Sequence, residues 1–325
     1  MIEPRDVEFH AIPDGQREEW TETNYFPFAI PESGLSGCVY TVFRPGLGVC
    51  MSDVTIFDRC ANHAEGLAYA DNQQHIPCPK SLAQYTLRNG LTVEALDPPS
   101  RYKIDYIGID DTELHFEFAG LMRPQDFNDP DQDPLVRRKQ VANGASAGAW
   151  GGAFNGHFDM TGHATGELLL RGRRHRIDCL STMDHSWGPR KERDNGSAAV
   201  IQAHFGERFA IHALTGLDPR EPDAIGPMYH GYVLTDGEVR GLVSGRGRVT
   251  RLGMFPASIA VSLADEGGRT YELTGSFLTW APWAPYPSIL YYQGLAQWNL
   301  QGRVGHGPYQ EILSRAFITR HRLSD

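Results

Sequence analysis

Apolar and polar residues alternate along much of the chain with a period of two, and the longer period of an amphipathic helix is hard to find. Residues 85–88 and 91–96 alternate on either side of Asn89-Gly90, a dipeptide that supplies the positive φ angles of a two-residue hairpin turn. Residues 102–107 and 114–118 continue the pattern. We therefore predict an antiparallel meander with one apolar and one polar face.

The same alternation returns further along the chain and predicts a second series of hairpins. The paired segments are residues 164–170 with 175–179, 199–204 with 209–214, 229–234 with 239–243, and 259–263 with 271–275. The hairpins flank Gly188-Pro189, a dipeptide that ends a strand. We therefore predict an all-β protein with little helix, built as two antiparallel barrels or sandwiches in tandem. The expected domains are residues 1–192 and 193–325, with the boundary near residues 188–198.

The composition agrees with this fold, because 35 Gly and 21 Pro suit many turns, and 6 Trp, 13 Tyr and 15 Phe suit strands. Two segments do not follow the pattern. Residues 124–140 are rich in Pro and Asp, and we interpret them as a solvated loop. A calcium loop is excluded there because Pro134 stands where such a loop needs Gly and Gln140 where it needs Glu. Residues 144–156 are rich in Gly, Ala and Trp, but no strand leads into them as a dinucleotide fingerprint requires.

The charge of the chain excludes several classes of partner. The 30 Lys and Arg against 40 Asp and Glu give a formal net charge of −10, which argues against nucleic acid and against an anionic membrane surface. No apolar run approaches the roughly 18 residues of a membrane-spanning helix, and Met1 to Asp6 show no secretory signal. The five cysteines are odd in number and form no CxxC pair, which favours reduced thiols in the cytoplasm over disulfides or a thiolate zinc site.

Motifs for nucleotide hydrolysis, serine hydrolysis and zinc proteolysis are absent from the sequence. His157 and Asp159 share one face of an extended strand, and His163 follows nearby. This group offers no convincing ligand set, because no further carboxylate or imidazole stands at ligand spacing. We therefore expect no bound metal and no organic cofactor.

The segment Met183-Asp184-His185-Ser186-Trp187-Gly188-Pro189-Arg190 carries the most concentrated chemistry in the chain. In an extended strand Asp184 and Ser186 face one way, and His185 and Trp187 face the other. One interpretation is structural: Asp184 pairs with a nearby arginine, and Trp187 fills the junction between two barrels. The other is that Asp184 or His185 donates a proton in an apolar cavity, where burial raises the pKa of a carboxyl group.

Three further segments are candidates for a ligand site. Residues 20–28 place Glu22 and Tyr25 on an expected first strand, and the C-terminal segment contains Glu311. A cluster of rings is either a packed loop over the end of a barrel or a rigid wall for a flat or isoprenoid-like ligand. The rings of this cluster belong to Trp280, Trp283, Tyr286, Tyr291, Tyr292 and Trp298.

Taken in order, residues 20–25, Gly166-Glu167-Leu168, residues 183–190 and residues 305–311 resemble the hydroxyneurosporene synthase (carotenoid hydratase) and AttH-like superfamily. The resemblance implies two lipocalin-like barrels in tandem, with a ligand cavity at or near their junction. The superfamily includes hydratases of unactivated alkenes, and more distant relatives include tocopherol cyclase and fungal enzymes that promote Diels–Alder cyclisations. Asp184 matches the acid implicated in hydration. Met183 departs from the family, which usually has Arg at this position, so that support for Asp184 must come from elsewhere, for example from Arg190.

These observations together favour a cofactor-independent hydratase or dehydratase that acts on a hydrophobic unsaturated small molecule such as an isoprenoid. The alternatives are an isomerase or cyclase with the same cavity, including a Diels–Alder-type enzyme, and a non-enzymatic carrier of a lipophilic ligand. The candidate catalytic residues are Asp184, His185, Glu22 and Glu311. The candidate ligand-binding residues are Tyr25, Trp187, Arg190, Tyr229, Trp280, Trp283, Tyr286, Tyr292 and Trp298.

Overall fold

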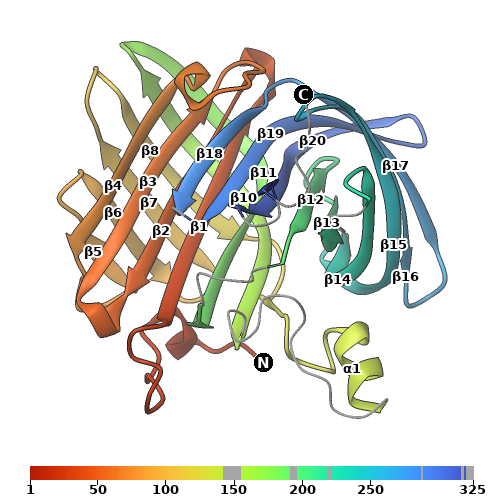
Figure 1. Ribbon diagram of the computed structural model, residues 1–325, viewed down its shortest axis with the longest axis horizontal. Coiled ribbons are helices and arrows are strands. Elements are labelled where there is room, and N and C mark those ends of the chain that lie inside the picture. Colours follow the sequence, from red (N-terminus) through yellow and green to blue (C-terminus); the bar gives the residue numbers. More distant parts are fainter. Residues whose placement is uncertain (142–154, 191–195, 218–220, 287, 316–317, 320–325) are drawn as a thin grey trace.

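The computed structural model describes residues 1–325 except 142–154, 191–195, 218–220, 287, 316–317 and 320–325. The side chains of residues 139–141 and 286 are also outside the description. The described part consists mainly of antiparallel strands in two sheets, which lie side by side and pack against each other (Figure 1). The predicted all-β, lipocalin-like fold is confirmed.

The first sheet is a curved half-barrel with the strand order β4-β3-β2-β1-β11-β10-β8-β7-β6-β5, and β9 pairs with β10. Its edge strands β4 and β5 form no ladder with each other within the described residues. The strands are β1 (Trp20–Ile30), β2 (Leu35–Arg44), β3 (Val49–Phe57), β4 (Tyr69–Pro77), β5 (Gln84–Thr86), β6 (Leu91–Asp97), β7 (Arg101–Ile107), β8 (Glu113–Gly120), β9 (Gln125–Asp126), β10 (Gly156–Leu170) and β11 (Arg173–Pro189).

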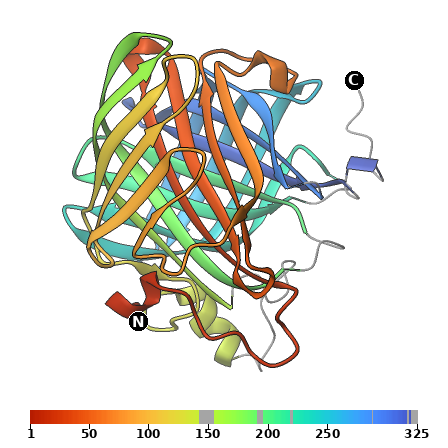
Figure 2. The ribbon, with the colours of Figure 1, turned by 90° about the vertical axis from the view of Figure 1, so that its left-hand side faces the viewer.

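The second sheet forms a closed eight-stranded barrel, because β17 also pairs with β19, and β18 extends it beside β19. Figure 2 shows the two sheets from the side of the half-barrel. The strands are β12 (Ala198–His204), β13 (Phe209–Leu217), β14 (Ala224–Thr235), β15 (Glu238–Leu252), β16 (Phe255–Asp265), β17 (Thr270–Phe277), β18 (Ala281–Tyr286), β19 (Ile289–Leu300) and β20 (Arg303–Ser314).

Helical structure is confined to short pieces of the described chain. They include the 3₁₀ turns η1 (Pro4–Val7), η2 (Pro31–Ser33), η3 (Pro45–Leu47) and η4 (Ala64–Gly66), and the helix α1 (Pro134–Val141); residues 315 and 318–319 are helical too. The interpretation of residues 124–140 as a solvated loop is wrong, since this segment contains β9, a buried Asp133 and the start of α1. Asp133 caps the helix: its Oδ1 accepts hydrogen bonds from the backbone N–H groups of Leu135 and Val136, 2.7 and 3.3 Å away. Pro134 at the first helical position needs no hydrogen-bond acceptor.

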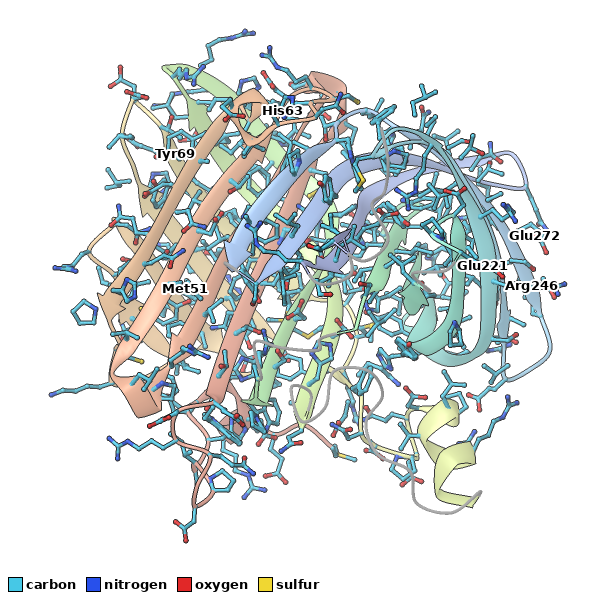
Figure 3. The ribbon with its side chains drawn as sticks, in the orientation of Figure 1. Met51, His63, Tyr69, Glu221, Arg246 and Glu272 are labelled. Atoms are coloured by element: carbon cyan, nitrogen blue, oxygen red, sulfur yellow. The ribbon has the colours of Figure 1, made fainter. Side chains whose placement is uncertain are left out.

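Strand alternation produces three large apolar clusters within and between the two sheets. The first fills the concave side of the half-barrel and also includes Ala210, Tyr232 and Leu234 of the other sheet, and the second fills the closed barrel. A third cluster joins Tyr25 and Tyr40 of the first sheet to Trp283 and Tyr291 of the second. In contrast, Glu221, Arg246 and Glu272 point away from this junction on the outer side of the closed barrel (Figure 3). The two sheets therefore share a core where β1 and β2 meet β18 and β19.

The hairpins predicted from the alternation are present with their expected partners, from β5–β6 at Asn89-Gly90 to β16–β17. β11 ends at Pro189, and the next strand begins at Ala198. The predicted boundary between residues 192 and 193 lies outside the described residues and stays a prediction, and residues 144–154 of the Gly-rich segment lie outside them too.

Candidate active site

Asp184 lies near the C-terminal end of β11, between β1 and β10. It is directly opposite Tyr25 on one side and Asp159 on the other. Because side chains that face each other across antiparallel strands point to the same face, these three side chains gather on one side of the first sheet. This is the side that meets the closed barrel.

Three imidazoles converge on one oxygen of Asp159. The Nε2 atoms of His157, His212 and His230 lie 3.1, 3.3 and 3.4 Å from Asp159 Oδ2. His157 belongs to β10, whereas His212 and His230 come from β13 and β14 of the closed barrel. The three imidazoles and Asp159 are all buried. The cluster therefore ties the two sheets together through a buried carboxylate.

Asp133 extends this cluster to α1. Its Oδ2 lies 2.6 Å from His230 Nδ1, while its Oδ1 caps the helix. Burial lowers the pKa of His230, but the hydrogen bonds with Asp133 and Asp159 outweigh this effect and raise the pKa to about 9. His230 is therefore an imidazolium at neutral pH, held between two carboxylates.

The two facing carboxyl groups have opposite proton affinities. Burial acts to raise the pKa of Asp159, but His212 and His157 overcome it and hold that pKa well below the usual range. Burial raises the pKa of Asp184 to about 7; His157 and Arg190 oppose the shift, and the charge of Asp159 adds to it. Asp159 is thus the ionised member of the pair and Asp184 the member that retains a proton. Asp184 also keeps part of its surface accessible, whereas Asp159 is only 3% exposed.

The apolar surroundings of this pair come from both sheets. Tyr25 donates a hydrogen bond to Gln293 Oε1 of β19 at 2.9 Å and packs against Tyr40, with the ring centres 6.1 Å apart. Tyr40 in turn packs against Trp283 at 5.5 Å and Tyr291 at 6.3 Å. Trp283 and Tyr25 are thus brought together in one aromatic cluster on the face that carries Asp184.

The other rings of the expected aromatic wall lie on different surfaces. Trp280, Tyr292 and Trp298 belong to the interior of the closed barrel, because they alternate with the residues that face the half-barrel. Tyr229 packs against a small separate cluster of Phe127, Ala198 and Leu214. The side chain of Tyr286 is outside the described residues.

Arg190 follows β11 and lies over the same face. Its guanidinium donates hydrogen bonds to the hydroxyls of Tyr40, Thr23 and Ser186 at 3.4, 3.3 and 2.5 Å. Its positive charge also acts to lower the pKa of Asp184, but the effect of burial outweighs it. Met183, which stands where the resemblance implies Arg, is buried in the core of the half-barrel.

The other predicted catalytic residues occupy two different places. His185, Trp187 and Glu22 lie on the concave side of the half-barrel, back to back with Asp184, and Trp187 is only partly buried. Glu311 is fully buried in a bidentate ion pair with Arg251, at 2.6 and 2.9 Å, and also accepts a hydrogen bond from Tyr309. The structure therefore brings together Asp184, Tyr25, Arg190 and Trp283, and separates them from Glu22, His185 and Glu311.

A pocket of about 540 Å³ opens further along β11. It is lined by residues that include Glu32, Asp178, His204 and His306, and not by Asp184. The expectation that Asp184 donates a proton in an apolar cavity stays a prediction.

Sequence reasoning missed Asp133, His212 and His230, although it had paired His157 with Asp159. These three residues belong to segments interpreted as a loop and as ordinary hairpins, and only the packing of two sheets reveals their common partner. The residue type was the signal that could have found two of them: His212 and His230 stand at buried positions of strands that are mainly apolar. His163 does not join the cluster and pairs with Asp178 at 2.8 Å on the solvent side.

These observations define a class of protein in which a lipocalin-like half-barrel packs on a lipocalin-like barrel. A buried histidine–carboxylate cluster lies between the two. The chain belongs to the family described as a domain of unknown function, DUF7064, whose model matches residues 3–312. None of the curated proteins matches the sequence.

Solved structures agree with this fold. A candidate AttH (NE1406) from Nitrosomonas europaea is 14% identical with a TM-score of 0.56, and the match covers 94% of this chain and 97% of that one. Kievitone hydratase from Nectria haematococca is 13% identical with a TM-score of 0.53, and the match covers 94% of each chain. At these identities the similarity concerns the fold, which is the AttH-like fold that the sequence resemblance implies.

Among the described helices, none has the length and apolar character needed to cross a membrane.

Proposed function

We propose that this protein is a hydratase-type lyase that adds water to, or removes it from, a hydrophobic unsaturated molecule such as an isoprenoid. Asp184 is the proton donor in this proposal. The observation that carries it is the placement of Asp184 directly opposite Asp159, whose carboxylate is held by three imidazoles. The fold shared with kievitone hydratase supports the reaction class.

Hydration of an alkene needs an acid that protonates carbon and an environment that stabilises the resulting cation. In the proposed reaction the π electrons of the alkene take the proton of Asp184, which leaves a carbocation and the Asp184 carboxylate. Water then forms a C–O bond with the cation, and its extra proton returns to Asp184. Dehydration follows the same steps in reverse. A positioned general acid contributes roughly 10²–10⁴-fold to the rate.

The neighbours of Asp184 suit the formation of the carbocation in this reaction. The ionised Asp159 and the faces of Tyr25 and Tyr40 favour a positive charge, and a desolvated aromatic face contributes about 2 kcal/mol. His212 and His157 hold the pKa of Asp159 well below its usual range and so keep it in its ionised form. No organic cofactor takes part in the proposed steps. The reduced cysteines favour a cytoplasmic setting, which also stays a prediction.

The test uses a panel of isoprenoid alkenes incubated with the protein in ¹⁸O-labelled water. We expect one labelled oxygen in the product and a loss of turnover of at least about a hundredfold in Asp184→Asn. The matched control is Asp178→Asn, an exposed position of the same strand that lines the other pocket. This control should retain turnover.

The alternatives give different results in the same experiment. A cyclase or isomerase gives a product without the label, and a carrier binds a panel member without turnover in either variant. Turnover that survives Asp184→Asn but is lost in Asp178→Asn would move the active site to the pocket along β11.

A further inference from the structure

We propose that His10, Glu22 and His185 form a binding site for a divalent transition-metal ion such as Zn²⁺. The site lies on the concave side of the half-barrel, on the opposite face of β1 and β11 from Asp184. It goes beyond the proposed function, which does not use it. One donor atom of each residue lies within 4.8 Å of the others.

The spacing of the donor atoms is close to that of the ligands of a tetrahedral ion. His10 Nδ1 lies 3.0 Å from Glu22 Oε2, and His185 Nε2 lies 3.8 Å from the same oxygen. Ligands that bind zinc at about 2.0–2.2 Å in tetrahedral geometry lie roughly 3.3–3.6 Å from each other. A small adjustment of the two rings therefore brings all three atoms to bonding distance of one ion. Two imidazoles and one carboxylate are a ligand set that zinc accepts.

The orientation of His185 is already that of a metal ligand. Its Nδ1 lies 2.9 Å from the carbonyl oxygen of Thr23 and 2.7 Å from Asn24 Oδ1. A carbonyl oxygen only accepts hydrogen bonds, so Nδ1 carries the proton and Nε2 presents its lone pair toward Glu22. This Nε2 is buried and has no hydrogen-bond partner among the described residues. The His185 side chain is 3% exposed, so bulk solvent does not reach this nitrogen.

Glu22 and His10 are held in a complementary way. Glu22 is fully buried, and its Oε1 accepts hydrogen bonds from Trp20 Nε1 and the His10 backbone N–H at 3.0 and 2.9 Å, which leaves Oε2 for a ligand. The outer nitrogen of His10, Nε2, lies 3.7 Å from Asp6 Oδ1. This separation is too long for a hydrogen bond, and His10 Nε2 has no hydrogen-bond partner among the described residues. The ring of Trp187 stacks on His10 at 3.9 Å and 9°, which fixes the plane of the imidazole.

The placement of His10 indicates how an ion reaches the site and which parts of the chain a bound ion would join. The His10 side chain is 19% exposed, whereas the other two ligands are buried, so that an ion enters from the side of the N-terminal segment. A bound ion would join this segment, which lies outside the sheet, to β1 and β11. Glu22 and His185 were expected from the sequence as catalytic residues, and in this proposal they bind a metal instead.

The experiment measures metal binding by the full-length protein after treatment with a chelator. Co²⁺ is titrated as a spectroscopic substitute for Zn²⁺, with visible absorption and quenching of tryptophan fluorescence as readouts, since Trp20 and Trp187 adjoin the site. We expect one Co²⁺ per chain, displaced by Zn²⁺. His10→Gln and Glu22→Gln should each weaken binding by at least about tenfold, because even residues that only orient metal ligands have effects of this size. His163→Gln is the matched control, an imidazole that pairs with Asp178 away from the site, and should bind as the wild type does.

Folding is checked by circular dichroism. Glu22 is buried, so Glu22→Gln disturbs the fold if the carboxylate is structural. His10→Gln therefore decides, in a folded protein, whether these residues bind a metal ion. A folded wild type that binds no Co²⁺ at a 1:1 ratio, or a His10→Gln variant that binds as tightly as the wild type, overturns the proposal. The readout is binding and not turnover, so the result is independent of whether Asp184 catalyses hydration.

Discussion

His230 connects the two sheets through the positive charge of its imidazolium. It belongs to the closed barrel, yet its two ring nitrogens face Asp133 before α1 and Asp159 of the half-barrel. All three side chains are buried, so each charge depends on the others for its solvation. The protonation state of His230 therefore affects the free energy of unfolding of the whole molecule.

This linkage predicts how stability depends on pH. The pKa of His230 is about 9 in the folded protein and about 6.5 in the unfolded chain. The folded-state pKa is the higher one, so the stabilisation is complete below about pH 6.5 and is lost as the pH rises through about 9. We expect the free energy of unfolding to fall by as much as about 3 kcal/mol over this range because of His230. Urea unfolding at several pH values measures it.

The control for this prediction is His230→Gln, which keeps an amide in place of the ring but does not titrate. The variant should be less stable at pH 6.5, and its stability should change less between pH 6.5 and 9. Parallel pH profiles for the two proteins would assign the dependence to other groups.

The α1 helix shows, at the level of an element, how one carboxylate serves two partners. Asp133 caps the helix with one oxygen and binds His230 with the other. Arg137 of the same helix pairs with Glu266 of the closed barrel at 2.8 Å, on the exposed side. The helix is therefore attached to the barrel at its N-terminal end.

Two variants separate the roles of Asp133. Asp133→Asn retains a capping oxygen but loses both the charge and the hydrogen-bond acceptor beside His230, whereas Asp133→Ala loses the cap as well. We expect Asp133→Ala to be the less stable variant by about 1 kcal/mol, the usual contribution of an N-cap. Urea unfolding at pH 7 measures the difference, and equal stabilities would show that the cap contributes nothing.

A second prediction at this level concerns the contact between β10 and β11. Gly156 lies opposite Trp187, and a Cβ atom at Gly156 would stand only 1.8 Å from the indole. Gly156→Ala therefore forces Trp187 away from His10. We expect a loss of about 1–3 kcal/mol in the free energy of unfolding, together with a changed near-UV circular dichroism spectrum.

Thr165→Ala, at an exposed position of the same strand, provides the comparison and should leave the spectrum unchanged. An unchanged spectrum in Gly156→Ala as well would mean that the strands separate without moving the indole.

The hairpins were predictable because period-two alternation and turn dipeptides such as Asn89-Gly90 are local features. The alternation of Asp184 and Ser186 with His185 and Trp187 was predictable for the same reason. Two features depend on distant parts of the chain and were not: the convergence of His212 and His230 on Asp159, and the approach of His10 to Glu22. The capped start of α1 is local, with Asp133 directly before Pro134, and the Pro- and Asp-rich composition of the segment concealed it. The division of the aromatic residues between the junction and the barrel interior also depends on register, which composition does not reveal.

At the scale of the whole molecule, the two sheets differ in how far each can bury its own core. The second sheet closes on itself through β17 and β19 and encloses a core of its own. The half-barrel keeps two edges, and part of its outer face is covered by β18 and β19. Removal of the closed barrel would expose Tyr25 and Tyr40 to water and leave Asp159 without His212 and His230.

This asymmetry predicts the behaviour of the two halves when they are produced separately, divided between residues 192 and 193. We expect residues 193–325 to fold into a barrel that is less stable than the full chain but still unfolds cooperatively in urea. Residues 1–192 should lack a cooperative transition, because burying a side chain such as Tyr25 or Tyr40 is worth about 1.5–3 kcal/mol, a large part of the stability of a domain. Circular dichroism and urea unfolding of each fragment provide the measurement. A 1–192 fragment that unfolds as sharply as the full chain would show that the half-barrel is an independent domain and that the histidine–carboxylate cluster contributes little to its folding.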